Sequence, residues 1–231
     1  LYGIEISSSN EILKFKPSTV AQIKTISKTM IEAEDDELYI ALVGYMAALS
    51  EKPLDLHELN DLDRLLILLG IKFNNELEPD KFKVICENCS QETDFTLTYA
   101  DVMSKIKIEK NLSRKNTFKI GDITIEVEFN LPSIFGVIEF RKYCKEHPEY
   151  NTTIQYNNLY YKNIKMIASN GQIIGEMNRK NTDLPTMFKL IDSISSGVNE
   201  LLNNYITEVA EPAFENFKYS FECPSCKKAA K

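Results

Sequence analysis

The sequence predicts an α+β fold with an N-terminal hairpin and helical cluster, a central antiparallel sheet, a long C-terminal helix and a discontinuous pair of Cys-x-x-Cys knuckles. Apolar residues recur at helical spacing up to about residue 75 and again near the C-terminus, and they alternate from Phe82 to Leu131. Each Cys pair follows an alternating stretch. We expect one compact domain, residues 1–231, with the hairpin and helical cluster in residues 1–78 and the sheet, long helix and knuckles in residues 79–231.

The chain begins with a predicted hairpin. Ile4 and Ile6 alternate with polar residues, SSSN supplies the turn, and residues 12–15 form the returning strand. Pro17 has no backbone N–H to donate to a ladder, so it ends this strand.

Two helices are expected next. Thr19 and Gln22 form a capping box for the first helix. The acidic run EAEDDE lies at the N-terminal end of the second helix, residues 38–49, where the helix dipole favours negative charge. This second helix is apolar on most faces, so we expect it to be central.

One or two further short helices are predicted in LDLHELNDLDRLLILLGIKF, after Pro53. Asn60 or Asp61 is the expected cap. Gly70 is the expected stop, because glycine is common directly after the last turn of a helix.

Alternation is clearest in ITIEVEFNLP, which follows a Gly-Asp hairpin-turn signal. Polar residues, Glu126 and Glu128 among them, occupy one face of this strand, so we expect an antiparallel sheet with one face in water. The apolar face consists of Ile123, Ile125, Val127, Phe129 and Leu131. FKVIC and DFTLTY, which flank the first Cys pair, are expected to join the same sheet.

Beyond Pro132 the spacing is helical over residues 134–147, ambiguous over 151–169, and typical of a loop or short hairpin in NGQIIGEMNRKNTD. Asp183 caps the long helix, and Pro212 ends it. Its apolar stripe consists of Leu184, Phe188, Ile191, Ile194, Val198, Leu201, Leu202 and Tyr205. FKYSFEC is the last expected strand.

The strongest chemical signal is the set of four cysteines Cys86, Cys89, Cys223 and Cys226. Four Cys at tetrahedral geometry form a structural zinc site with no open coordination position. Roughly 130 residues separate the two pairs, whereas common zinc ribbons have a spacing of about 15–20 residues. We therefore expect structural Zn²⁺ that clamps the C-terminus onto the middle sheet, with knuckle amides donating to the thiolates.

Two other readings of the cysteines remain open, a redox-active disulfide and incidental thiols. Neither pair begins a helix in a thioredoxin-like βαβ pattern, which disfavours the redox reading. Cys144 lies on a helical stripe with Phe140 and is expected to be a buried core thiol.

Composition excludes several classes of protein. A net charge of −7 and a pI near 5.1 argue against nucleic-acid binding, which requires a basic face. No apolar run reaches the roughly 18 residues that a membrane span requires. LYGIEISSSNE lacks the basic flank and cleavage site of a signal peptide, so we expect the protein in the cytoplasm during its synthesis.

No catalytic constellation is evident. His57 and His147 lie in charged stretches that we expect to be exposed, and neither belongs to a metal or nucleophile motif. We therefore predict a protein that is not an enzyme. Tyr156, Tyr160 and Tyr161 are weak candidates for partner contacts, because tyrosine is enriched at interfaces; packing against the long helix is the alternative.

The order of these segments resembles the baseplate hub subunits of T-even-like contractile-tailed phages. The resemblance rests on a basic–Phe–basic–Pro step at residues 14–17, the Asp/Leu-rich segment, and the Cys86–Cys89 pair. ITIEVEFNLPS with Pro132 and the closing Phe-x-Cys-Pro-x-Cys motif at residues 221–226 complete it. It spans nearly the whole chain, loosely between residues 151 and 211, and Lys16 stands where the family often has Arg.

The resemblance implies a non-enzymatic structural or assembly component of the baseplate hub. Its location would be the virion tail baseplate, and the host cytoplasm during assembly. Its partners would be other baseplate and hub proteins in a symmetric multi-chain assembly. The alternative from another class is a zinc-ribbon adaptor of a host transcription or translation complex, which would bind nucleic acid in a salt-dependent way.

Overall fold

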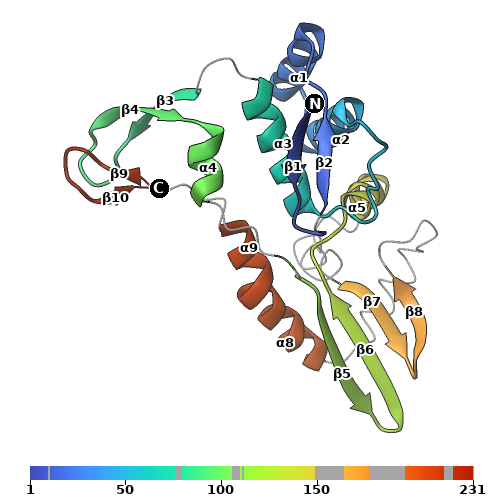
Figure 1. Cartoon of the computed structure of the whole chain (residues 1–231). Helices are drawn as coiled ribbons and strands as arrows, with labels where there is room; N and C mark the ends of the chain where they lie inside the picture. Colours follow the sequence, from blue (N-terminus) through green and yellow to red (C-terminus); the bar gives the residue numbers. More distant parts are fainter. Residues whose placement is uncertain are drawn as a thin grey trace.

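The computed structural model describes residues 1–9, 11–75, 80–105, 110, 112–148, 164–176, 196–215 and 221–230. It is a mixed structure of helices and antiparallel sheets, as the sequence predicts (Figure 1). In chain order the helices are α1 (Val20–Glu32), α2 (Asp35–Leu49), α3 (Asp61–Asn75), α4 (Tyr99–Lys105), α5 (Ile134–Glu146), α8 (Ser196–Tyr205), the π-helical segment η2 (Ile206–Ala210) and α9 (Glu211–Glu215). The strands are β1 (Tyr2–Glu5), β2 (Ile12–Phe15), β3 (Asp80–Ile85), β4 (Glu92–Leu97), β5 (Arg114–Ile120), β6 (Ile123–Phe129), β7 (Ile164–Ser169), β8 (Gln172–Glu176), β9 (Phe221–Glu222) and β10 (Ala229–Ala230).

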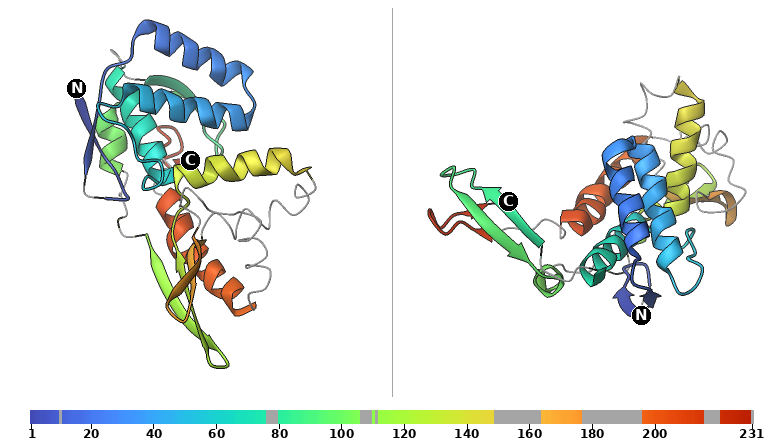
Figure 2. Two further views of the ribbon diagram at one scale, coloured as in Figure 1. Left: turned by 90° about the vertical axis from the view of Figure 1, so that its right-hand side faces the viewer. Right: turned by 90° about the horizontal axis from the view of Figure 1, so that it is seen from above.

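The N-terminal hairpin and three of the helices form one packed unit. The capping box of α1 is confirmed: the backbone N–H of Thr19 donates to Gln22 and that of Gln22 donates to Thr19. Figure 2 shows α2 beside α1, and α2 also contacts α3. The buried core of this unit consists of Ile4, Ile6, Phe15, Tyr39, Val43, Met46, Leu49, Leu59, Ile67, Ile71, Ile134 and Val137.

Gly70 does not end α3, contrary to the expectation from sequence. The helix continues to Asn75, and Gly70 lies inside it against the side chain of Ile4 in β1. A Cβ on Gly70 would lie 2.5 Å from Cδ1 of Ile4. Sequence reasoning could not separate a glycine required by this contact from one that follows the last turn.

This contact gives a prediction with an internal control. Gly70→Ala should lower the free energy of unfolding by about 1–3 kcal/mol, because the added methyl group overpacks the core against Ile4. Gly44→Ala on α2, where a Cβ would meet nothing within 4 Å, should raise it by about 0.5–1 kcal/mol through helix propensity. Urea unfolding of the two variants checks the prediction, and equal changes of the same sign would contradict it.

The turn of the first hairpin is attached to the N-terminus of α3 by the buried carboxylate of Asp63. Its Oδ1 accepts from the backbone N–H of Ser7 at 2.5 Å, the hydroxyl of Ser7 at 2.8 Å and the backbone N–H of Ser8 at 3.1 Å. Its Oδ2 accepts from the N–H of Asn60 at 3.0 Å, while the Asn60 side chain accepts from the N–H of Asp63 at 2.9 Å. Asn60 is therefore the cap of α3, and Asp63 joins helix and hairpin into one unit.

Helix α5 joins this unit through the ring of Tyr39. The guanidinium groups of Arg64 and Arg141 lie 4.5 and 4.7 Å from the ring centroid, and Arg141 also pairs with Asp36 of α2. The Tyr39 hydroxyl donates to Asp61 at 2.9 Å. Residues of α2, α3 and α5 thus meet at one aromatic side chain.

The second unit is a four-stranded antiparallel sheet in the order β5-β6-β7-β8. The Gly-Asp turn between β5 and β6 is confirmed, and Asn170–Gly171, both at positive φ, turns β7 into β8. Helix α8 packs on the sheet, with the ring of Tyr205 5.6 Å from that of Phe129. The expected start of this helix at Asp183 lies outside the described residues.

Two details differ from the sequence reading of this unit. Glu128 is buried rather than on a wet face, and it accepts from the Ser113 hydroxyl at 2.7 Å. Pro212 lies inside α9 instead of ending the helix. Proline usually breaks an α-helix because it has no N–H to donate and its ring clashes with the carbonyl four residues earlier. Here the wider π-helical turn η2 precedes Pro212, and the N–H of Glu211 donates to the carbonyl of Ile206.

The two Cys pairs lie on two further hairpins, β3–β4 and β9–β10, which we call the Cys lobe. No strand pairing joins the Cys lobe to the four-stranded sheet in the described residues. Figures 1 and 2 show the lobe beside the main body, and α4, which follows β4, contacts α3. A metal would therefore join two hairpins of one lobe, rather than the C-terminus and the middle sheet.

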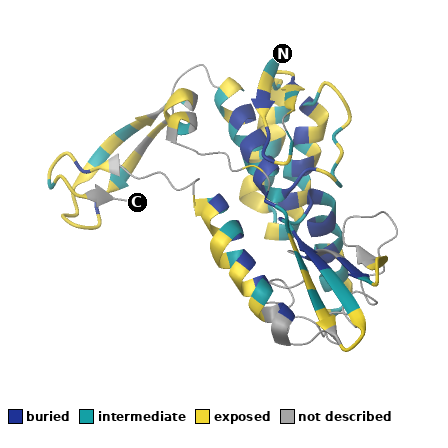
Figure 3. Cartoon of the chain, turned by 60° about the horizontal axis from the view of Figure 1, so that its bottom comes forward, coloured by how far each residue is buried: buried dark blue, intermediate teal, exposed yellow. Residues whose placement is uncertain are grey.

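Burial is unequal between these parts (Figure 3). Buried side chains concentrate in the helical unit and between α8 and the sheet, whereas the Cys lobe is mostly exposed. Within the described ranges, no helix has both the length and the apolar character needed to cross a lipid bilayer.

Candidate metal centre

The four predicted cysteines converge at one point of the Cys lobe. The Sγ atoms of Cys86, Cys89, Cys223 and Cys226 all lie within 4.8 Å of one another. Sγ of Cys86 is 3.7 Å from that of Cys226, and Sγ of Cys89 is 3.7 Å from that of Cys223. A tetrahedron of sulfur atoms at about 2.3 Å from one ion has edges of about 3.8 Å. Two of the six sulfur–sulfur distances match this edge and all six are at most 4.8 Å, so the four thiols are placed to hold one metal ion.

The two knuckles repeat one backbone pattern. The N–H of Ser90 donates to the Cys86 carbonyl at 2.7 Å, and the N–H of Cys86 donates to the Gln91 carbonyl at 3.0 Å. In the second knuckle Lys227 donates to the Cys223 carbonyl at 2.9 Å, and Cys223 donates to the Lys228 carbonyl at 3.0 Å. The repeated turn aims both sulfurs of each pair to the same side.

The electrostatics of the cluster favour one thiolate in the absence of a cation. Burial disfavours ionisation of Cys86, but hydrogen bonds from the backbone N–H groups of Asn88 and Cys89 outweigh it and lower its pKa to about 6. The Gln91 N–H favours the Cys89 thiolate, yet burial and the neighbouring sulfur atoms raise the pKa of Cys89. Four thiolates side by side require a multivalent cation to offset their repulsion.

Among the side chains that the structure describes, the apolar core of the Cys lobe is small. Its buried residues are Cys86 and Cys223, with Val84, Phe95 and Cys226 partly buried around them. At roughly 25 cal/mol per Å² of apolar area, so small a cluster cannot offset the entropy of ordering four strands. A metal ion held by the four thiols would add stabilisation to this lobe, and such a role is structural.

Each knuckle places a residue other than glycine in the left-handed region, Ser90 at φ 55° and Lys227 at φ 58°. Lys227→Gly should stabilise the metal-bound lobe by about 1 kcal/mol, because glycine adopts this conformation without the Cβ clash. Amide hydrogen exchange of the lobe, recorded at increasing temperature, measures the change in its free energy of unfolding. Lys228→Gly is the control, because Lys228 is next in the chain and lies outside the left-handed region. An equal gain in stability from Lys228→Gly would contradict the claim that the backbone of Lys227 is strained.

The other candidate residues are dispersed. The ring of His57 lies 4.1 Å from that of Phe135, and the ring of His147 lies 4.3 Å from that of Tyr143, so both are half-buried rather than exposed. Cys144 packs at the edge of the sheet core, away from the four-cysteine cluster. Tyr156, Tyr160 and Tyr161 lie outside the described residues, and their partner role stays a prediction.

Sequence reasoning missed three features near these sites: helix α4, strand β10 and the buried carboxylate of Asp63. The Asn-x-x-Asp spacing at residues 60–63 carried a capping signal for Asp63. The Ala-Ala strand β10 carries no signal, because its place depends on pairing with β9.

Comparison with known proteins agrees with the order of these elements. A family model described as T4 bacteriophage base plate protein matches residues 2–231, nearly the whole chain and both halves of the cysteine cluster. The searches of curated proteins and of solved structures found no match. The chain therefore belongs to the T4 bacteriophage base plate protein family.

Proposed function

We propose that the chain is a non-enzymatic structural or assembly component of the central hub of a contractile phage tail baseplate. The observation that carries this proposal is the family match over residues 2–231. The order of motifs, from the Lys-Phe-Lys-Pro step to the closing Cys-Pro-x-Cys, supports the hub in particular. Its partners would be other baseplate proteins, met first in the host cytoplasm and then in the tail.

We propose Zn²⁺ as the resident metal, held by Cys86, Cys89, Cys223 and Cys226. Four soft thiolate donors close to one point favour zinc among the common divalent ions, because zinc accepts four sulfur ligands in tetrahedral coordination. With all four positions taken by protein, the ion holds the fold and offers no site for substrate. Its contribution is to keep the two hairpins of the Cys lobe in one fixed relation.

The proposal of a single domain, residues 1–231, receives support from contacts between the helical unit and the segment that follows the β3–β4 hairpin of the lobe. Helix α4 contacts α3, and Lys110 in the connection after α4 pairs with Glu5 of β1 at 2.7 Å. Acidic side chains slightly outnumber lysines in residues 80–97 and 221–230, a balance that argues against a nucleic-acid adaptor.

Quantitative mass spectrometry of purified phage particles and of infected-cell lysate tests the function. A fixed small ratio to the tail-tube protein, with cross-links to hub proteins, identifies a structural hub component. Presence in hub intermediates but not in particles identifies an assembly factor. Absence from both, or cross-links confined to host transcription or translation proteins, would overturn the proposal.

A further inference from the structure

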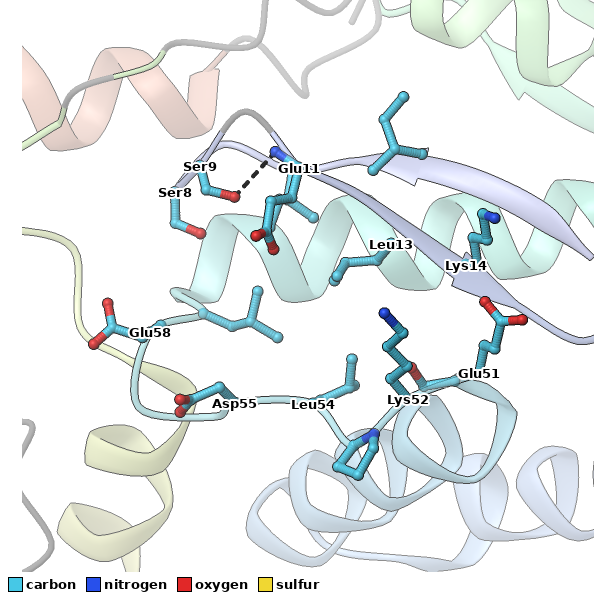
Figure 4. Close-up of a pocket in the computed structure, with 15 residues that line it drawn as sticks. Ser8, Ser9, Glu11, Leu13, Lys14, Glu51, Lys52, Leu54, Asp55 and Glu58 are labelled. Atoms are coloured by element: carbon cyan, nitrogen blue, oxygen red, sulfur yellow. Dashed lines mark hydrogen bonds between the residues drawn. The ribbon is translucent and has the colours of Figure 1, made fainter.

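A cavity of about 700 Å³ lies between the first hairpin and the loop that joins α2 to α3 (Figure 4). This volume is within the roughly 300–1,000 Å³ found for ligand sites. Its walls include β2 at residues 12–14 and the loop at residues 50–59. We call this cavity the β2 groove; it is separate from the metal centre.

One wall of the β2 groove is a strand edge whose pairing stops early. Residues 49–51 pair antiparallel with β2: the N–H of Lys16 donates to the Leu49 carbonyl at 2.8 Å, and the N–H of Glu51 donates to the Lys14 carbonyl at 2.9 Å. Phe15 lies opposite Ser50. In the part of the chain that the structure describes, this ladder ends at Lys14 and Glu51.

The sequence explains why the ladder stops there. In the register that sets Phe15 opposite Ser50, the residue opposite Ile12 is Pro53, which has no N–H to donate. In an antiparallel strand, the backbone groups of every second residue point to the same side. The backbone groups of Lys14 and Lys16 form hydrogen bonds with the loop, so the N–H and carbonyl of Ile12 also point to that side, into the groove. The edge at Ile12 is thus left without a main-chain partner from the loop.

The side chains around this edge have the form of a strand-binding groove. Ile6 and Leu59 are buried at its floor, and Leu13 and Leu54 are partly buried beside them. The Ile12 side chain is 65% exposed, although it is a large apolar residue on a strand. An added strand would cover this side chain by cross-strand packing.

Charge around the groove is unevenly distributed. Figure 4 shows Glu11, Asp55 and Glu58 toward the hairpin-turn end, whereas Lys14 and Lys52 lie with Glu51 at the end near α2. The turn end therefore carries three carboxylates, and the occupant there must be basic.

We propose that the β2 groove binds an extended segment of a partner protein, which adds a strand to the edge of β2 at Ile12 and places Lys or Arg side chains against Glu11 and Glu58. Main-chain hydrogen bonds to Ile12 provide the affinity, the apolar floor accepts alternate side chains, and the carboxylates select a basic segment. The contact is short, so it is weak alone and gains strength in an assembly with several contacts. The proposal does not depend on the place of the chain in the baseplate.

The test uses the purified full-length chain with bound zinc and a fluorescein-labelled, end-blocked peptide of alternating Val and Lys, about seven residues long. Fluorescence anisotropy gives its Kd, and amide shifts of the ¹⁵N-labelled chain locate it. We expect the largest shifts at residues 11–14 and 51–58. A peptide with Glu in place of Lys, and one with alternate N-methylated residues, should each bind at least about tenfold more weakly.

Two sets of variants separate the strand pairing from the charge. Ile12→Pro removes the N–H that faces the groove but keeps the bonds of residues 13 and 15 to β1, and it should weaken binding about tenfold, whereas Ile12→Ala should not. Glu11→Lys with Glu58→Lys should reverse the preference toward the Glu peptide. Glu32→Lys with Glu34→Lys, on exposed residues around the end of α1, is the charge-matched control.

Three results would overturn the proposal. The Glu peptide could bind as tightly as the Lys peptide, the double Glu11/Glu58 variant could leave the preference unchanged, or the shifts could lie elsewhere. Concentration-dependent self-association that Ile12→Pro abolishes would assign the edge to a second copy of this chain instead. Because no phage particle is involved, these outcomes are independent of the mass-spectrometric test of function.

Discussion

Replacement of Cys226 by serine should remove the zinc that we propose for the four-cysteine cluster and unfold the Cys lobe while the rest of the chain stays folded. The reason is that, among the side chains of the lobe that the structure describes, only Val84 and Phe95 join the cysteines in its core. Structural zinc in small domains is worth about 10–16 kcal/mol of apparent binding energy, and loss of one thiolate forfeits much of it. Metal analysis should fall from about one zinc per chain to nearly none.

Hydrogen exchange gives the spatial readout for this variant. Amides of residues 80–97 and 221–230 should lose their protection, whereas those of β6 and α8 should keep it, because the sheet core does not include the lobe. Cys144→Ser is the matched control, since Cys144 lies outside the cluster and should leave zinc content unchanged. Lobe protection that survives in a zinc-free Cys226→Ser protein would show that the metal does not hold the hairpins.

Replacement of Asp63 by asparagine should destabilise the helical unit by about 3 kcal/mol. The Asp63 carboxylate is fully buried and accepts four hydrogen bonds from neutral donors, three of them from the turn of the first hairpin. Asparagine has the same shape but turns one acceptor into an NH₂ donor, which leaves buried N–H groups facing another donor. A loss of this size corresponds to about 10 °C in Tm for a chain of this length.

Asp35→Asn is the control for this prediction. Asp35 also lies in the first turn of a helix, but it is exposed, so its removal should cost only the few tenths of a kcal/mol of a screened helix-dipole interaction. Urea unfolding of the two variants compares them directly. Equal small losses would mean that the hairpin turn does not depend on Asp63, and the wall of the β2 groove would then lack its anchor.

Helix capping and tight turns were readable from the sequence because each is a short-range effect. The Thr19–Gln22 box, the acidic first turn of α2 and the Gly-Asp turn before β6 each depend on neighbours within four residues. The cysteine cluster was predictable for a chemical reason instead. Four thiols in two knuckles have few uses other than a shared metal ion, even across a separation of 134 residues between Cys89 and Cys223.

Features that depend on which elements meet were not readable in this way. Gly70 has the sequence context of a helix stop but lies inside α3 against Ile4 of β1. Glu128 has the alternation of a polar strand face but is buried and accepts a hydrogen bond from Ser113. Pro212 has the chemistry of a helix breaker, but a π turn accommodates it. In each case the local sequence pattern is compatible with two structural environments, and the packing of distant elements decides which of the two occurs.

The sequence by itself determined the first hairpin, the helices α1, α2, α3 and α5 and the identity of the four sulfur donors, because hydrogen-bond periodicity and thiol chemistry act locally. Tertiary structure decided that the donors close a lobe of their own rather than the middle sheet, and that β2 keeps an edge open opposite Pro53 of the loop between α2 and α3. Pairing between distant strands and the shape of a cavity arise from the simultaneous packing of many elements. No window of sequence contains that information.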